Sequence, residues 1–160
     1  MTRQAFEHHD HHACIRDAVD TAARLSAERG VQFTAIRRRV LELLLAEHRA
    51  MGAYDILDAL RAEGRGAQPP VAYRALDFLV RQGFAHRIER LNAFAACAHP
   101  GVDHSPAFLI CRACASVSEA RGAPAPEGLN ASARAQGFVI ERTMVEAEGL
   151  CPNCVEGSPA

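Results

Sequence analysis

Apolar residues recur at helical spacing through the first half of the chain. The stretch "FTAIRRRVLELLLAEHRA" places Ile36, Val40 and Leu44 on one face, which is the pattern of a helix that buries one side. The same spacing runs through "CIRDAVDTAARLSAERG", "GAYDILDALRAEG" and "VAYRALDFLVRQGF", and each of these three segments ends at or near a glycine. The pattern predicts four helices, the last of them from Val71 to Gln82.

The period changes after this fourth helix. The stretch "AHRIERLNAFAAC" alternates in short segments around Leu91-Asn92-Ala93, which predicts a β-hairpin. Helices followed by a tight hairpin are typical of a winged helix-turn-helix, in which helix 71–82 would enter the major groove of DNA. We assign residues 14–98 to this DNA-binding domain.

A linker-like segment, "AHPGVDHSP", precedes a second and smaller unit. Here "AFLIC", "SVSEA" and "FVIERTMVEA" predict strands, with one helix near Glu127 to Gln136. We take residues 99–106 as a hinge and residues 107–160 as a small α/β domain. A lone core below roughly 70–80 residues usually needs a metal, a disulfide or a partner subunit. The predicted fold class is therefore α+β, with a second domain that needs a bound metal, a disulfide or a partner subunit to be stable.

Composition and charge indicate in which compartment the protein acts and which kinds of partner it can bind. The 160-residue chain has no apolar run near the roughly 20 residues of a membrane span, and its polar start is unlike a signal peptide, so we expect a cytoplasmic protein without a membrane partner. The net charge is −1, but residues 24–90 hold 12 Arg against 8 acidic residues, and residues 91–160 hold 4 Arg against 7. Only the N-terminal half therefore suits a polyanion such as DNA.

Four of the six cysteines form two Cys-x-x-Cys pairs. Cys111 and Cys114 stand in "CRAC", and Cys151 and Cys154 stand in "CPNC". In a reducing compartment such pairs bind metal more often than they form disulfides, and two pairs complete the tetrahedron that zinc prefers. Redox motifs of this kind occur near a βαβ pattern, which neither pair has. The spacing predicts a structural zinc site that joins both ends of the small domain.

Further possible ligands lie around the junction of the two domains. They are His86, Cys97, His99, His104 and Glu119. Each has an ordinary alternative as a solvated or buried side chain, so spacing alone leaves a second metal site open. The N-terminal stretch "EHHDHHAC", with His8, His9, His11, His12 and Cys14, is interpreted as a flexible tail over residues 1–13 with adventitious metal affinity.

The segments "AYDILDALR", "PPVAYRALDFLVRQGF", "FLICRAC" and "GLCPNC", in this order, resemble the zinc uptake regulator branch of the ferric uptake regulator superfamily. The resemblance covers Ala22 to Cys154. It implies a homodimeric repressor with a C-terminal dimerisation domain, a structural zinc on the four paired cysteines, and a second, regulatory zinc, hence two ions per protomer. By the same resemblance, the regulatory ligands are His86, Cys97, His104 and Glu119. His104, seven residues before Cys111, fits the family pattern better than His99.

The resemblance also implies contacts with double-stranded operator DNA. Tyr73 and Arg74 would lie on the recognition helix, Tyr54 on the helix before it, and Arg37 at a phosphate. An arginine fork on guanine O6 and N7 gives about 1–3 kcal/mol of discrimination. On the helix of Tyr54, Asp58 and Arg61 can pair within the helix or between neighbouring dimers on one operator.

These features predict a repressor of zinc-uptake genes that binds palindromic DNA when zinc is sufficient. One alternative is an iron, manganese or peroxide sensor of the same superfamily, but Cys97 favours zinc, because ferrous and manganous sensors would use nitrogen and oxygen ligands. A second is a zinc chaperone or buffer without specific DNA binding. A zinc hydrolase is disfavoured, since four protein ligands leave no position for a reactive water. We expect neither enzymatic activity nor a small-molecule substrate.

Overall fold

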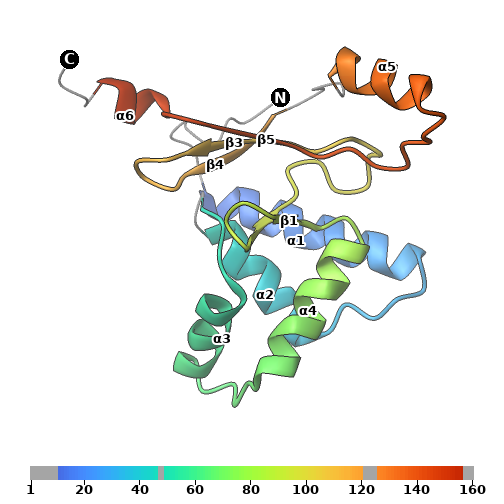
Figure 1. Cartoon of the computed structure of the whole chain (residues 1–160). Coiled ribbons are helices and arrows are strands. Elements are labelled where there is room, and N and C mark those ends of the chain that lie inside the picture. Colours follow the sequence, from blue (N-terminus) through green and yellow to red (C-terminus); the bar gives the residue numbers. More distant parts are fainter. Residues whose placement is uncertain (1–10, 47–48, 121–125, 157–160) are drawn as a thin grey trace. The chain divides into compact units, whose positions relative to one another are not determined.

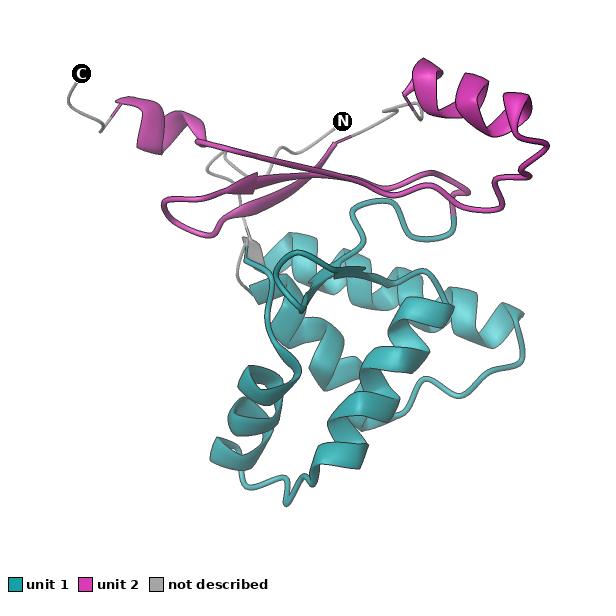
Figure 2. Ribbon diagram, in the orientation of Figure 1, with its two compact units in different colours: residues 1–101 teal, residues 102–160 magenta. Residues whose placement is uncertain are grey.

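The computed structural model describes residues 11–46, 49–120 and 126–156. The chain divides into two compact units between Gly101 and Val102 (Figure 2), inside the segment expected to be a hinge. The histidines His8 and His9 lie outside the described residues, whereas His11 and His12 begin the first helix. The helix therefore starts within the segment expected to be a tail.

The described part of the first unit has four helices followed by a hairpin, in the order that the hydrophobic pattern predicts (Figure 1). The helices are α1 (His11–Glu28), α2 (Ala35–Ala46), α3 (Ala53–Ala62) and α4 (Pro69–Arg81). The strands β1 (Ala85–Ile88) and β2 (Ala93–Ala96) are antiparallel. Helix α4 begins two residues earlier than predicted, because proline is tolerated in the first turn, where backbone N–H groups lack a helical partner. No described helix is both long and apolar enough to cross a membrane.

The core of the first unit is formed by the predicted helical faces. Val40 and Leu44 of α2, Ile56 and Leu60 of α3, and Leu79 of α4 are almost completely buried. Burying one such side chain stabilises the fold by about 1.5–3 kcal/mol. The buried stripe on α4 also fixes which of its side chains face outward.

Two backbone connections tie the hairpin to the helices that precede it. Helix α4 ends at Arg81, two residues before Gly83, whose φ of 73° is easily adopted by glycine, and the chain then passes through Phe84 directly into β1. Met51, just before α3, exchanges two hydrogen bonds of 2.9 and 2.8 Å with the backbone of Phe94 in β2. The hairpin is thereby joined to the start of α3 as well as to the end of α4.

The described part of the second unit is a three-stranded sheet with two short helices. Its strand order is β4 (Val117–Ala120), β3 (Ala107–Cys111), β5 (Val145–Gly149), with α5 (Glu127–Ala135) before β5 and α6 (Pro152–Glu156) after it. Strand β3 pairs antiparallel with β4 and parallel with β5. Phe108, Ile110 and Val117 are its buried large hydrophobic residues among those described. This small core agrees with the expectation that the unit needs an additional staple.

The last predicted strand is much shorter than expected. The stretch "FVIERTMVEA" spans residues 138–147, but only Val145–Gly149 pairs with β3. Phe138 and Val139 are 67% and 79% exposed. Strand β3 has only five residues, so in the described chain residues 138–144 have no ladder partner, and apolar residues such as Phe138 and Val139 do not by themselves create a strand. Helix α6, which carries Cys154, was not predicted.

Candidate metal centres and nucleic-acid interface

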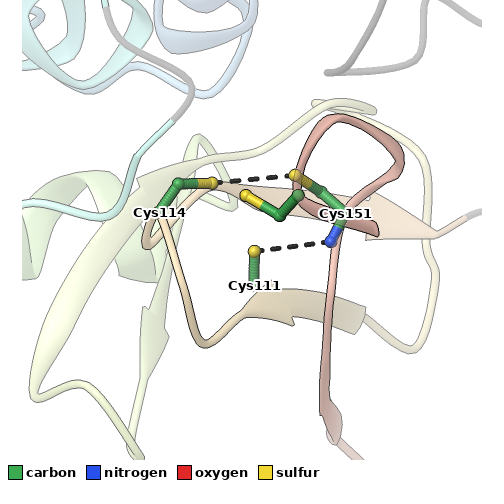
Figure 3. Close-up of side chains that lie close together, drawn as sticks. Cys111, Cys114 and Cys151 are labelled. Carbon is green, nitrogen blue, oxygen red and sulfur yellow. Dashed lines mark hydrogen bonds between the residues drawn. The ribbon is translucent and has the colours of Figure 1, made fainter. Parts of the chain in front are cut away.

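The four paired cysteines converge at one end of the sheet in the second unit (Figure 3). Strands β3 and β5 are parallel, with Cys111 beside Gly149. The segments that follow these two strands therefore begin at the same end of the sheet. After β3 the chain makes a tight turn in which Ala115 has a φ of 59° and donates to the Cys111 carbonyl. After β5, the N–H of Cys154 donates to the Cys151 carbonyl. Each turn directs two sulfurs to a common point.

The sulfur positions fit a tetrahedral zinc site. All four sulfurs lie within 4.8 Å of one another, and those of Cys114 and Cys151 are 3.7 Å apart. Zinc–sulfur bonds of about 2.3 Å in a tetrahedron place the sulfurs about 3.8 Å apart. A disulfide would need sulfurs about 2.05 Å apart. The cluster therefore has the spacing of metal ligands, and all four thiols are free.

The thiols of this cluster differ in how readily they ionise. The backbone N–H of Cys151 donates to the Cys111 sulfur at 3.4 Å and, with other N–H groups of the turn, lowers the pKa of Cys111 to about 6. The Ser116 hydroxyl and backbone lower the pKa of Cys114. The sulfurs of Cys151 and Cys114 raise the pKa of Cys154 to about 12. Four negative thiolates in so small a volume repel one another unless a cation joins them, which is the role of zinc.

His104 and Glu119, two of the predicted regulatory ligands, lie side by side within the second unit. Nε2 of His104 is 2.6 Å from the Glu119 carboxylate, whose side chain is only 3% exposed. The Val102 carbonyl can only accept, so Nδ1 of His104, at 2.7 Å, carries its hydrogen and Nε2 faces the carboxylate. Burial opposes the charged ring, but the bonds to Val102 and Glu119 outweigh it and raise the pKa of His104. This carboxylate–imidazole pair can exchange its shared proton for a metal ion.

His86 and Cys97, the other two predicted regulatory ligands, lie close together on the hairpin of the first unit. His86 in β1 and Cys97, directly after β2, are 6% and 5% exposed, and a ring nitrogen of His86 lies within 4.8 Å of the Cys97 sulfur. The N–H of Cys97 donates to the Phe84 carbonyl at 2.9 Å, which fixes the thiol beside β1. The N–H of His99 donates to the same sulfur at 3.3 Å. The predicted regulatory ligands are thus brought together in twos, one pair in each unit.

The predicted DNA-contact residues differ in exposure. On α4, Tyr73 is 48% exposed and Arg74 is exposed, while the adjacent Ala72 and Ala75 are buried. Tyr54, at the second position of α3, is 65% exposed. These three side chains are free of the core and available to a groove.

The remaining predicted contacts have partners inside the first unit. The guanidinium of Arg37 lies 3.8 Å above the Phe78 ring and donates to the Gln32 carbonyl, so it holds the start of α2 against α4. On α3, Arg61 is 3.8 Å from Asp58 and donates to the Ala67 carbonyl. Both members of the Asp58–Arg61 pair are largely exposed and could still meet another molecule.

Sequence reasoning did not single out two residues on the exposed face of α4. Asp77 and Arg81 form an ion pair one turn apart, and Asp77 is itself one turn after Tyr73. Asp77 is four residues after Tyr73 and Arg81 is four residues after Asp77, and this helical spacing is the signal that could have identified them. They place one negative and one positive side chain beside the residues expected to read bases.

Comparison with known proteins adds an independent observation. No protein-family model matches the chain. The zinc uptake regulation proteins of Escherichia coli (strain K12) and Shigella flexneri are each 38% identical to it over 136 residues, covering 84% of this chain and 80% of theirs. A solved zinc uptake regulator complexed with zinc and DNA is 36% identical, with a TM-score of 0.80 over 89% of this chain and 96% of that one. The crystal structure of holo XcZur is 40% identical, with a TM-score of 0.78 over 88% and 98%.

Proposed function

The chain belongs to the zinc uptake regulator (Zur) family, and we propose that it is a repressor that binds palindromic operator DNA when a regulatory zinc ion is bound. Zinc-responsive DNA binding is the function that the relatives and the described sites support. We infer that its targets are genes of zinc uptake, repressed when zinc is sufficient.

We propose two zinc ions per protomer with different roles. The structural ion would take Cys111, Cys114, Cys151 and Cys154, and the regulatory ion would take His86, Cys97, His104 and Glu119. Two imidazoles, a thiolate and a carboxylate suit borderline-soft, tetrahedral Zn²⁺ better than iron or manganese. His104 is the better candidate than His99, because its Nε2 already faces a second ligand, Glu119.

The observation that carries the proposal is the position of the hairpin ligands. His86 and Cys97 lie on the hairpin that continues directly from α4, the helix that presents Tyr73 and Arg74. A zinc ion that takes two ligands from the hairpin and two from the second unit would restrict the segment between them. In a dimer this would hold both α4 helices at the spacing of palindromic half-sites.

We further propose that the repressor acts as a homodimer through its second unit. Strand β5 forms an edge of the sheet, and Leu109, Leu129, Phe138 and Val139 are exposed apolar residues of this unit. A second copy packed against this unit would pair with the β5 edge and bury exposed apolar residues of this kind. The pair Asp58–Arg61, exposed on α3, would contact a neighbouring dimer on the same operator and make repression cooperative.

Recovery of sheared genomic DNA by the purified protein, with free zinc buffered low and then high, tests this function. We expect a few promoter-proximal palindromes to be enriched only at high zinc. The variant Cys97→Ser should lose this enrichment, whereas Cys14→Ser, which changes a cysteine outside both proposed sites, should keep it.

Each other outcome contradicts a named part of the proposal. Equal enrichment at both zinc levels would remove the regulatory role from His86, Cys97, His104 and Glu119. A response that survives Cys97→Ser would favour a sensor that uses only nitrogen and oxygen ligands. No enrichment at either level would exclude the repressor and favour a zinc chaperone or buffer.

A further inference from the structure

We propose that Arg29, at the end of the first helix, is a positioning residue that transmits zinc binding at the hairpin to the recognition helix α4. The inference rests on the proposed function and concerns contacts within the first unit alone. Arg29 is neither a predicted metal ligand nor a predicted DNA contact, and it is 53 positions away in sequence from the residue that it bonds.

Arg29 clamps the C-terminal end of α4. Its Nη1 donates to the Gln82 backbone carbonyl at 2.7 Å and to the Gln82 side-chain oxygen at 3.2 Å. Gln82 is the C-cap of α4, so the bond satisfies a carbonyl that the helix leaves without an internal partner. A cation at this end also complements the negative pole of the helix dipole.

The same guanidinium covers the residue that joins α4 to the hairpin. It lies 5.6 Å from the centre of the Phe84 ring. Phe84 is only 1% exposed, and its ring also packs against the rings of Phe33 and Phe78. The Phe84 N–H donates to the Leu79 carbonyl at 2.8 Å, and the Gly83 N–H donates to the Val80 carbonyl at 3.1 Å. These two bonds close the Schellman motif that ends α4, so Phe84 is fixed to the recognition helix.

Phe84 is also fixed to a proposed zinc ligand. Its carbonyl accepts the N–H of Cys97 at 2.9 Å, and it is two residues before His86. The contacts therefore run without a gap from the backbone of Cys97 through the Phe84 backbone to the last turn of α4, with Arg29, directly after α1, holding the junction. A shift of the hairpin on zinc binding would turn α4 only while this junction is rigid.

The variant Arg29→Ala removes the clamp, and Arg24→Ala is its matched control. Arg24 lies on α1, five residues before Arg29, but its described ion pair is an exposed one with Glu28, one turn away in the same helix. For the wild type and each variant, with the four-cysteine site filled, DNA affinity would be measured at low and at saturating free zinc, using the fragment most enriched from the genome. Regulatory-zinc affinity without DNA would be measured by chelator competition, and the unfolding midpoint by thermal denaturation.

We expect Arg29→Ala to reduce the ratio of DNA affinities with and without zinc by about three- to tenfold. Its zinc-free DNA affinity and its zinc affinity should stay within about twofold of wild type, since the lost contacts concern transmission between sites. Arg29→Lys should recover part of the ratio, because an ammonium can still donate to the Gln82 carbonyl. Arg24→Ala should keep the full ratio. A purely structural role would lower the unfolding midpoint and leave the ratio unchanged.

An unchanged ratio in Arg29→Ala, beside a normal zinc response of the wild type, would overturn this inference while leaving the proposed function in place. A proportional loss of DNA affinity both with and without zinc would also overturn it, because Arg29 would then support DNA binding directly. If the DNA affinity of the wild type did not change with zinc, the proposed function would be overturned, and this inference with it.

Discussion

We propose that Arg74 reads a base, because it is exposed on α4 whereas its neighbours Ala75 and Leu76 are buried. Lysine keeps the charge but lacks the planar fork that matches guanine O6 and N7. We expect Arg74→Lys to weaken binding to the recovered operator by about 1–3 kcal/mol and to relax selectivity at one base position. Selection from a randomised duplex pool would measure this. An unchanged base preference would remove Arg74 from base recognition, and Arg24→Lys, on α1, serves as the control.

At the level of elements, one ion-pair network fixes α3 against α2. The Arg39 guanidinium donates to the Glu63 carboxylate at 3.0 and 2.7 Å and to Glu42 at 2.8 Å, and Arg65 also donates to Glu63. The bonds from Arg39 lower the pKa of Glu63. The folded protein therefore holds Glu63 ionised at a pH where the unfolded chain, with a carboxyl pKa of about 4.3, already binds a proton.

The pH dependence of this network has a definite sign. Its stabilisation is present above the unfolded pKa of Glu63 and is lost as the pH falls through the lowered folded value. We expect Glu63→Gln to lower the thermal unfolding midpoint near pH 7, and this difference from wild type to shrink towards zero as the pH approaches the lowered folded value. A difference that does not change between neutral and acidic pH would show that the carboxylate's charge is irrelevant to the α2–α3 contact.

Two glycines in open surroundings separate backbone strain from helix propensity. Gly83, just after α4, has a φ of 73°, whereas Gly128 is the second residue of α5, and a Cβ at either position would meet nothing within 4 Å. Alanine at position 83 should therefore cost about 1 kcal/mol of unfolding free energy. Alanine at position 128 should stabilise its helix by about 0.5–1 kcal/mol. Urea denaturation of both variants measures this, and effects of the same sign would contradict the assigned backbone conformations.

An element could be predicted where a local sequence pattern determines it, and could not where it depends on contacts between distant segments. The helices of the first unit were predictable because positions such as Val40, Leu44 and Leu79 repeat with a local period that also buries them. The four-cysteine site was predictable because its spacing is local within each pair. The strand over residues 138–144 was predicted wrongly, since pairing depends on the length of β3, which the residues of this segment do not encode. The roles of Arg29 and Phe84 depend on contacts between distant segments and had no local signal.

For the whole molecule, zinc removal should affect the two units unequally. The second unit has few buried apolar side chains and four thiols that repel one another when ionised, so we expect its fold to depend on the structural ion. After exhaustive chelation, amide hydrogen exchange should accelerate strongly in β3, β5 and α6 while α2, α3 and α4 remain protected. The variant Cys151→Ser should reproduce this pattern with zinc present. Equal protection of both units after chelation would exclude a structural role for the four-cysteine site.

The central claim is that one zinc ion, held by His86, Cys97, His104 and Glu119, and operator DNA strengthen each other's binding. Linkage requires zinc to tighten DNA binding by the same factor by which DNA tightens zinc binding. The most direct test is therefore a titration of the recovered operator against the intact protein over a buffered range of free zinc, read both as DNA bound and as zinc bound. We predict two equal factors well above one, with both falling to one in Cys97→Ser. A DNA affinity independent of zinc after the structural site is filled would contradict the account.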